Sequence, residues 1–557
     1  MKQHVDREKV LLAWIPATRG SFSMFFRPLA LALLIAAVAA SSASAGSVCA
    51  SSCFQAPAGS GALLVFNGHG WGHGVGMSQY GAYGYAQHGS TFDQILAHYY
   101  PGTTLGPAPA STIRVLLADK KKKLTIEATA PLTVRDAAGK SHHVPAGPFL
   151  LDVKTLQWPV PLTVKARRGS FLGYGKNEYR GSFFFDVVDG KLRMIDVVGL
   201  EQYLWGVVPA EMPSDWAPEA LKAQAVAARS YALATRAVGA PFDVYSDTRS
   251  QMYLGVLHEA ASTTAAVNAT KGKVVLYQGK VATTYFSSTS GGETESSADW
   301  TGTAIPYLVS VPDPYDLLSP YHDWGPVPIT AAAVLKALKL TGPITDVTTT
   351  PNLAGRVGQL KLTTPLKATT VQATTLRGAI GLRSTWFTVG LLSLTPPQPV
   401  APITYGSKVT LAGVVRGFAG VTLEQKPLGT DWSTVRTMTT GTAQVSPTIT
   451  TDYRLATTSV AAGSIRVKVM PALTLASVVS AGVTGAEQPV LMGVTVDIEQ
   501  QNPDLTWTPV ASGLVEADGT FNVPAALTAG ATVRVVITPP TNSGYVAATS
   551  APQIVSG

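Results

Sequence analysis

The sequence predicts an α+β domain followed by two all-β sandwich modules. The chain has 557 residues, more than one hydrophobic core can serve. Helix-like and strand-like patterns alternate over residues 61–392, whereas residues beyond 400 are rich in Thr and Val and carry almost no helix signal. The composition, with 52 Gly, 38 Pro and only 14% charged residues, is typical of turn-rich extracellular modules.

The N-terminus reads as an export signal. An apolar run at 29–40 follows Arg27 and precedes the small residues SSASA. This pattern predicts a signal peptide over residues 1–45 and a secreted protein of the extracellular space or cell wall. The alternative is an uncleaved anchor, the one expected membrane contact, although the run is short for a membrane span. In the leader 46–60, export favours a disulfide between Cys49 and Cys53.

Charge and motifs exclude several functions. The formal net charge of +8 suits an anionic cell envelope, but no basic domain indicates nucleic-acid binding. The sequence has no Walker loop and no dinucleotide fingerprint, so we expect no cofactor. It also lacks a G-x-S-x-G nucleophile elbow, which argues against a serine hydrolase.

The first domain contains recognisable elements in order. Asp189-Gly190 separates two apolar runs and predicts a hairpin. The Ala-rich segment 218–236 predicts a helix, with Pro218 in its first turn. Predicted strands are 113–118, 124–128, 183–188, 273–277 and 281–288.

Residues 68–76 read GHGWGHGVG, with glycine at every second position. Five glycines disfavour a helix, so we expect an extended strand with His69, Trp71, His73 and Val75 on one face. The bare opposite face would let another backbone or a sugar ring approach. A zinc site at His69 and His73 is the competing interpretation. Zinc needs about four ligands, and no others occur at recognisable spacing, so we expect no metal.

Glu211 is the candidate catalytic residue. Val207, Val208 and Pro209 precede it, and Met212 and Trp216 follow. Apolar surroundings disfavour the charged carboxylate, which raises its pKa and suits it to act as a general acid at a glycosidic bond. The alternative is a structural Glu packed beside a Trp.

The C-terminal part repeats itself. Glu424-Gln425 and Trp432 recur 75 residues later as Glu499-Gln500 and Trp507. We expect a linker at 393–400, followed by immunoglobulin-like β-sandwich modules at 401–473 and 474–557. Their expected role is spacing or surface binding.

Several motifs together resemble the SpoIID/LytB family of stage II sporulation protein D and the LytB amidase enhancer. The resemblance covers residues 61–392, where it implies a SpoIID/LytB-like peptidoglycan-acting domain. The matching motifs are GHGVGMSQYGA (72–82), EMP with KAQAVAARSYAL (211–233), D-x-x-x-Q-x-Y-x-G (247–255), T-x-G-x-V-x-x-Y-x-G (270–279) and YFSSTSGGETES (285–296).

The resemblance implies a lytic transglycosylase that cleaves between N-acetylmuramic acid and N-acetylglucosamine, with Glu211 as its acid. The other family branch implies an amidase enhancer that binds peptidoglycan and activates or recruits an N-acetylmuramoyl-L-alanine amidase. Here the His-Gly element precedes the EMP element, which suggests a circular permutation. The resemblance implies that some relatives bind zinc through cysteines. This domain has no cysteine, so we do not expect a metal site in it.

The expected partners are glycan strands and a cell-wall amidase. The motifs do not decide between a role in sporulation and general wall remodelling. The residues expected to contact the glycan are His69, Trp71, His73, Ser78, Gln79, Gln224, Arg229, Gln251, Tyr253, Ser290, Gly291 and Gly292.

Overall fold

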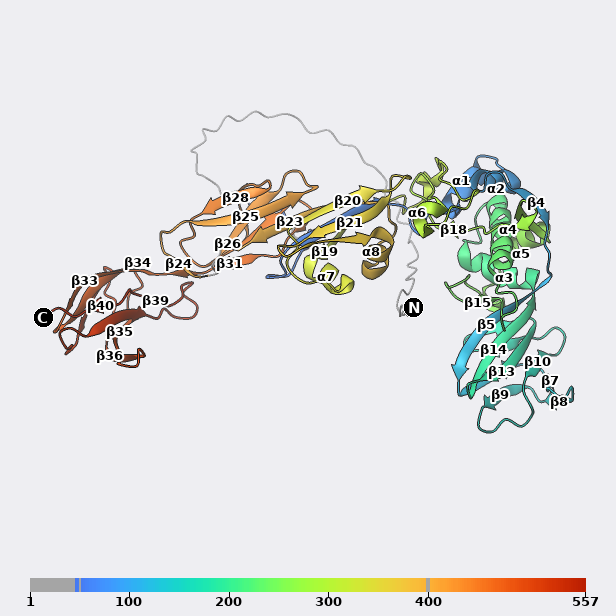
Figure 1. The fold of residues 1–557 in the computed structure, drawn as a ribbon, viewed down its shortest axis with the longest axis horizontal. Coiled ribbons are helices and arrows are strands. Elements are labelled where there is room, and N and C mark those ends of the chain that lie inside the picture. The colour runs from blue at the N-terminus through green and yellow to red at the C-terminus, as the bar shows by residue number, and fades with distance from the viewer. Residues whose placement is uncertain (1–45, 50–51, 397–400) are drawn as a thin grey trace, which may run out of the picture. The chain divides into compact units, whose positions relative to one another are not determined.

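The computed structural model describes residues 46–49, 52–396 and 401–557. The predicted signal peptide at 1–45 and residues 397–400 of the predicted linker lie outside this described part. Within it, no helix is long and apolar enough to cross a membrane. Strands dominate the chain, as the composition indicates, and helices are few (Figure 1).

The largest sheet of the first domain has seven strands. In spatial order they are β15 (Val244–Tyr245), β5 (Thr112–Lys121), β14 (Lys191–Gly199), β13 (Ser182–Val188), β10 (Leu162–Ala166), β7 (Leu132–Arg135) and β8 (Ser141–Val144). The predicted hairpin is confirmed, because Val188 pairs with Lys191 around Asp189 and Gly190, which both have positive φ.

A four-stranded sheet shares the hydrophobic core of the seven-stranded sheet. Its strands are β12 (Asn177–Tyr179), β11 (Leu172–Tyr174), β6 (Lys123–Ala128) and β9 (Gly147–Asp152). Ile126 from this sheet and Phe183 and Phe185 from the larger one are fully buried in that core. The alternating burial along β6 and β13 matches the two-residue period of a half-buried strand.

Three helices close this core: α3 (Leu200–Glu211), α4 (Pro218–Thr235) and α5 (Ala261–Ala269). The predicted helix at 218–236 is confirmed as α4, with Pro218 in its first turn. Small side chains line α4, so α1 (Gln79–Gln87), α2 (Phe92–Tyr99), α3 and α5 all pack against it. This crowding buries Gln224 and Arg229, which the sequence analysis expects to contact the glycan.

A five-stranded sheet crosses the predicted domain boundary at residue 392. Its order is β19 (Asp323–Thr330), β2 (Leu63–His69), β23 (Phe387–Thr395), β25 (Val409–Arg416) and β28 (Gly441–Val445). Leu64 and Phe66 pack on the side of α7 (Ala331–Leu338) and α8 (Ala373–Ile380), whereas Leu63 and Val65 join the core of the next module. Strand β23 pairs with β2, which precedes the predicted linker, and with β25, which follows it. Residues 393–395 of the linker predicted at 393–400 belong to β23 itself, because they pair with β25.

Two C-terminal strand sets follow one pairing order. In the first, β30 (Val460–Ala461), β29 (Thr451–Ala456), β26 (Thr422–Pro427) and β27 (Ser433–Thr437) are neighbours, and β31 (Ile465–Val467) also pairs with β29. In the second, the order is β39 (Ala548–Thr549), β38 (Thr532–Ile537), β35 (Thr495–Gln501) and β36 (Trp507–Leu514), with β40 (Gln553–Ile554) on β38. The sequence repeat thus has a counterpart in strand pairing, while the immunoglobulin-like assignment stays a prediction.

The remaining elements complete the chain. The short helices are η1 (Val256–His258), α6 (Ser297–Thr301) and η2 (Asp316–Leu318). The remaining strands are β1 (Phe54–Gln55), β3 (Met77–Ser78), β4 (Thr104–Pro107), β16 (Lys273–Tyr277), β17 (Lys280–Val281), β18 (Phe286–Ser287), β20 (Asp346–Pro351), β21 (Val357–Thr363), β22 (Ala368–Gln372), β24 (Ile403–Thr404), β32 (Val469–Met470), β33 (Ala472–Val479), β34 (Gly482–Gln488) and β37 (Thr520–Pro524).

Two strand predictions need correction. The run 281–288 forms only β17 and β18, because residues 282–285 leave the sheet. The predicted strand at 68–76 ends at His69, since Gly70, Gly72, Gly74 and Gly76 all adopt positive φ. Glycine is required there for a second reason: a Cβ at Gly76 would overlap the carbonyl oxygen of Tyr285.

Candidate functional site

Glu211 ends helix α3 and keeps part of its surface exposed. Its Oε1 accepts a hydrogen bond of 2.8 Å from the backbone N–H of Met252. Burial raises the pKa of Glu211, and this outweighs the lowering effect of the Met252 N–H. A partly accessible carboxyl that holds its proton more firmly than usual can donate that proton to a bound ligand.

Two tyrosines lie close to the Glu211 carboxyl. Its charge adds to burial in raising the pKa of Tyr203 on α3 and of Tyr231 on α4. Tyr203 donates a hydrogen bond of 3.2 Å to Oε1 of Gln251, the residue before Met252. The segment at Gln251 and Met252, which binds the Glu211 carboxyl through the Met252 N–H, is therefore itself anchored to α3 by Tyr203.

The motif at 72–82 reaches the EMP motif in space. Gln79, at the start of α1, donates from Nε2 to the backbone oxygen of Glu211 at 2.8 Å and lies 3.4 Å from Oε1 of Gln224. Gln79 is 132 residues from Glu211 and 145 residues from Gln224 in the sequence, so the fold brings two distant motifs together. The predicted residues Gln79 and Gln224 thus adjoin the backbone of Glu211.

Aromatic side chains of α1 flank the turn after Glu211. Trp216 stacks on Tyr83 with ring centroids 4.6 Å apart and an interplanar angle of 18°. Tyr80 meets the same indole edge-on at 4.7 Å. All three residues keep partial exposure, so their rings offer apolar surface beside a polar acid. Such a combination suits a ligand with both apolar ring faces and hydroxyl groups.

Asp313 and Asp316 organise the Ser-Gly-Gly turn. Asp316 is fully buried and accepts hydrogen bonds from the Ser78 hydroxyl (2.7 Å) and from the backbone N–H groups of Ser290 and Gly291 (2.9 Å each). Asp313 accepts from the Ser290 hydroxyl at 2.7 Å. Burial, followed by the charge of Asp316, raises the pKa of Asp313 to about 6. Sequence analysis missed both aspartates, because they lie in no motif.

His73 is held by hydrogen bonds to the backbone and by ring stacking. Its Nδ1 accepts the backbone N–H of Val75 at 3.0 Å, and its ring stacks on Trp300 at 4.6 Å. A further hydrogen bond joins it to the backbone of Phe286. Burial and then Arg377 and Arg356 lower the pKa of His73 to about 3, so it is neutral at physiological pH. His73 packs against Trp300 and keeps partial exposure, and its glycan contact stays a prediction.

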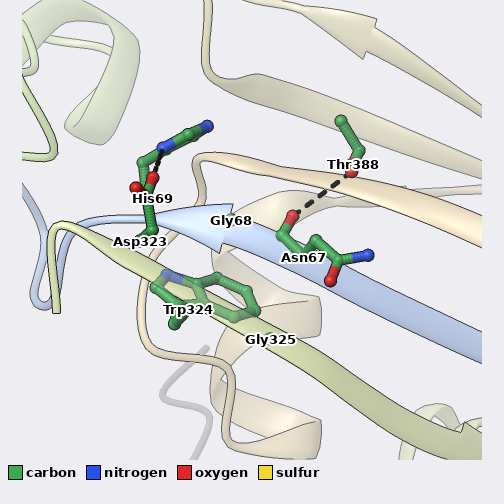
Figure 2. Close-up of a pocket in the computed structure, with 7 residues that line it drawn as sticks. All are labelled: Asn67, Gly68, His69, Asp323, Trp324, Gly325 and Thr388. Carbon is green, nitrogen blue, oxygen red and sulfur yellow. Dashed lines mark hydrogen bonds and ion pairs between the residues drawn. The ribbon is translucent and has the colours of Figure 1, made fainter. Parts of the chain in front are cut away.

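His69 lies elsewhere, at a pocket on the edge of the β19–β2–β23 sheet (Figure 2). Its Nδ1 lies 2.6 Å from Oδ1 of Asp323, and both side chains are substantially exposed. The lining residues are Asn67, Gly68, His69, Asp323, Trp324, Gly325 and Thr388. None of the hydrogen bonds or ion pairs among the described residues joins His69 directly to Glu211.

Trp71 keeps partial exposure and meets Tyr321 edge-on at 4.3 Å, with the Arg383 guanidinium over both rings. Burial and then Tyr321 raise the pKa of Tyr80. Among the predicted His-Gly residues, Trp71 therefore connects through Tyr321 towards Tyr80. His73 connects through Tyr285 towards Tyr231. His69 and His73 diverge because the chain turns at each intervening glycine.

Most other predicted contact residues are buried supports. Arg229 is fully buried, and its guanidinium binds Glu201 at 2.6 Å and the backbone oxygen of Lys273 at 3.0 Å. Tyr253 is 2% exposed and donates to Asp196 at 2.9 Å. Ser78, Ser290 and Gly291 are buried in the Asp316 network, and Gly292 keeps partial exposure. Contacts between segments far apart in the sequence withdraw these groups from solvent.

Gln224 and Gln251 are buried but incompletely bonded. Each has an Nε2 amide group without a hydrogen-bond partner in the structure. Asp247, a candidate second acid, pairs instead with exposed Arg249, and Glu293 accepts from Ser310. Among the described residues, no group of three or more His, Cys, Asp or Glu side chains could hold a metal ion. Cys49 and Cys53 form the predicted disulfide.

Comparison with known proteins matches the segment that carries Glu211. Residues 188–277 match the family model described as stage II sporulation protein. The amidase enhancer of Bacillus subtilis is 38% identical over 140 residues, covering 25% of this chain and 19% of that protein. Stage II sporulation protein D of Bacillus subtilis is 38% identical over 145 residues, covering 23% of this chain and 42% of that protein.

An uncharacterized protein of Brachyspira hyodysenteriae is 43% identical over 137 residues, covering 24% of this chain and 37% of that protein. Among solved structures, the human OSCAR ligand-binding domain aligns with 15% identity over 29% of this chain and 97% of its own, but with a TM-score of 0.13. That score carries no statement about fold. The family match and the named relatives establish that this chain contains a domain of the SpoIID/LytB family.

Proposed function

We propose that the protein cleaves peptidoglycan glycan strands as a lytic transglycosylase, with Glu211 as general acid and then base. The observation that carries this proposal is the state of Glu211: a partly exposed carboxyl whose pKa burial raises and whose side chain accepts one backbone hydrogen bond. A general acid needs this combination of a retained proton and ligand access.

In the proposed step, the Glu211 carboxyl gives its proton to the oxygen that links N-acetylmuramic acid to N-acetylglucosamine. The bond from that oxygen to the muramyl C1 breaks through an oxocarbenium-like state. The muramyl 6-hydroxyl then attacks C1 and its proton passes to the Glu211 carboxylate, which restores the acid. The internal hydroxyl replaces the second carboxylate of an ordinary glycosidase, and no carboxylate contact to Glu211 occurs among the described residues.

The partly exposed rings of Tyr80, Tyr83 and Trp216 would bind the sugar faces beside Glu211. The proposed location is the extracellular side of the cell wall after export, which the predicted signal peptide supports. The paired C-terminal strand sets are proposed to be immunoglobulin-like modules that hold the enzyme at the envelope. The first domain is proposed to be the α+β catalytic domain of the family.

A second candidate function follows from the similarity to a protein named amidase enhancer. In that case the chain would bind peptidoglycan and stimulate an N-acetylmuramoyl-L-alanine amidase without chemistry of its own. The aromatic side chains would keep their role, whereas the proton on Glu211 would have none.

The test is mass spectrometry of purified glycan strands, both peptide-bearing and stripped, after incubation with the full chain. The wild type should release 1,6-anhydromuramyl products, and Glu211→Gln should release none while keeping its fold. Glu127→Gln is the matched control, because Glu127 is an exposed carboxylate on β6. Equal product from Glu211→Gln and wild type would refute the catalytic role. Absent products together with stimulation of an added amidase would favour the enhancer.

A further inference from the structure

Two matching clusters of charged and aromatic side chains lie on the two C-terminal strand sets. In the first, Arg454 binds Glu424 at 2.8 Å and lies 4.0 Å over the ring of Trp432. In the second, Arg534 binds Glu499 at 2.6 Å and lies 4.2 Å over Trp507. Arg454 and Glu424 lie on β29 and β26, as Arg534 and Glu499 lie on the corresponding strands β38 and β35. Trp432 directly precedes β27, and Trp507 is the first residue of the corresponding strand β36.

The first cluster is covered by the chain's own N-terminal segment. Oε1 of Glu424 accepts hydrogen bonds from the Ser47 hydroxyl (2.7 Å) and from the Val48 backbone N–H (2.8 Å). Further along, β1 adds to the sheet edge in parallel with β30. The backbone N–H groups of Phe54 and Ala56 donate to the oxygens of Ser459 and Ala461 at 3.0 Å each.

The second cluster lacks that cover. Its sheet ends at β39, whereas the first sheet continues from β30 to β1. Thr549 occupies the position in the second set that Ala461 occupies in the first, because Thr549 pairs with Val536 as Ala461 pairs with Ala456. Thr549 is exposed, whereas Ala461 is fully buried.

The ion pair of the second cluster is also more exposed than that of the first. The side chains of Arg534 and Glu499 are 29% and 18% exposed, against 4% and 0% for Arg454 and Glu424. Nε and Nη2 of Arg534 both contact Oε2 of Glu499, at 2.7 and 2.6 Å. Oε1 of Glu499 therefore has no hydrogen-bond partner among the described residues, where Oε1 of Glu424 has two.

We propose that the second strand set binds an extended segment of another polypeptide, which adds to β39 as a parallel strand. A serine or threonine hydroxyl and the following backbone N–H of that segment would bind Oε1 of Glu499. Edge strands with unpaired backbone groups accept such added strands, and main-chain hydrogen bonds supply much of the affinity. This inference concerns a protein-binding site and is independent of the chemistry at Glu211.

The occupant follows from the first strand set. There the same Glu-Arg-Trp cluster and the same edge are occupied by polypeptide, with backbone donors spaced as in a strand. A sugar offers hydroxyl groups for Glu499 but no row of N–H donors for the β39 backbone. The geometry therefore favours a peptide over a glycan.

The test measures binding of a synthetic peptide of residues 46–57, closed by its disulfide, to the full chain by calorimetry. We expect one peptide per chain, because the first site is already filled. Thr549→Lys and Glu499→Ala should each weaken binding at least about tenfold, roughly one charge-assisted hydrogen bond. The control Glu516→Ala changes an exposed carboxylate of the same module and should bind as wild type.

A peptide with Ser47 replaced by Ala should also bind more weakly, which tests the Glu499 contact without altering the protein. If the full chain self-associates and Thr549→Lys abolishes this self-association, the proposal is supported and the occupant is a second copy of the chain. Binding that depends on Glu424 and not on Glu499 or Thr549 would overturn it, because the peptide would then be exchanging at the first site. Absence of peptide binding, with or without glycan binding to this module, would also overturn it.

Discussion

Replacement of Asp316 by Asn tests whether one buried carboxylate holds the Ser-Gly-Gly turn in place. Asp316 is fully buried and accepts four hydrogen bonds, from Ser78, Ser290, Gly291 and His322, at 2.7 to 3.1 Å. Asparagine offers a single oxygen, so two of these bonds are lost and an amide N–H faces other donors. At about 1.5–3 kcal/mol for each bond to a charged group, the loss is roughly 3–6 kcal/mol.

A second effect acts through Asp313. Its pKa is raised to about 6 from an ordinary value of 3.8, in part by the Asp316 charge. The folded state therefore binds this proton more tightly than the unfolded state. The resulting stability is fully present below pH 3.8 and is lost as the pH rises to about 6, a cost of about 3 kcal/mol. Asp316→Asn lowers the pKa of Asp313, so it returns part of that cost at neutral pH and flattens the pH dependence.

The assay is hydrogen exchange followed by mass spectrometry on a peptide spanning residues 286–294, which reports local opening. A net loss of about 3 kcal/mol corresponds to roughly 100-fold faster exchange at neutral pH. Asp323→Asn is the matched control, because its side chain is 74% exposed and pairs only with His69. An exposed pair contributes less than about 1 kcal/mol. Equal exchange rates in the two variants would refute the role assigned to Asp316.

Two further predictions concern stability near the candidate catalytic residue. Because burial raises the pKa of Glu211, its ionisation destabilises the fold as the pH rises above about 4.5. Glu211→Gln, whose oxygen still accepts from Met252, should therefore melt no lower than wild type at pH 7 in scanning calorimetry; a lower melting temperature would contradict the burial argument. Arg229→Met should cost about 3–5 kcal/mol in urea unfolding, because it strands the Glu201 charge and two backbone oxygens. The control Arg249→Met removes an exposed pair and should cost less than about 1 kcal/mol, and a similar cost for both would show that Arg229 is not a buried anchor.

The sequence by itself determined features that depend on short-range chemistry. The α4 helix follows from its alanines and Pro218, and the β13–β14 hairpin follows from Asp189-Gly190, because propensity and turn geometry act over a few residues. The apolar neighbours of Glu211 predicted the direction of its pKa shift, since they are adjacent in the chain. The 75-residue spacing of Glu424 and Glu499 predicted two repeated β modules, and the structure has two strand sets in matching order there.

Only the tertiary structure decided which polar residues face solvent. The sequence predicted that Arg229 contacts the glycan, but packing of α3 and α5 against α4 buries it. Asp313 and Asp316 carry no motif, and their partners are up to 238 residues away. The added strand β1 covers one of two similar sheet edges through pairing across some 400 residues. Such contacts arise from long-range burial and hydrogen bonding, which local periodicity does not encode.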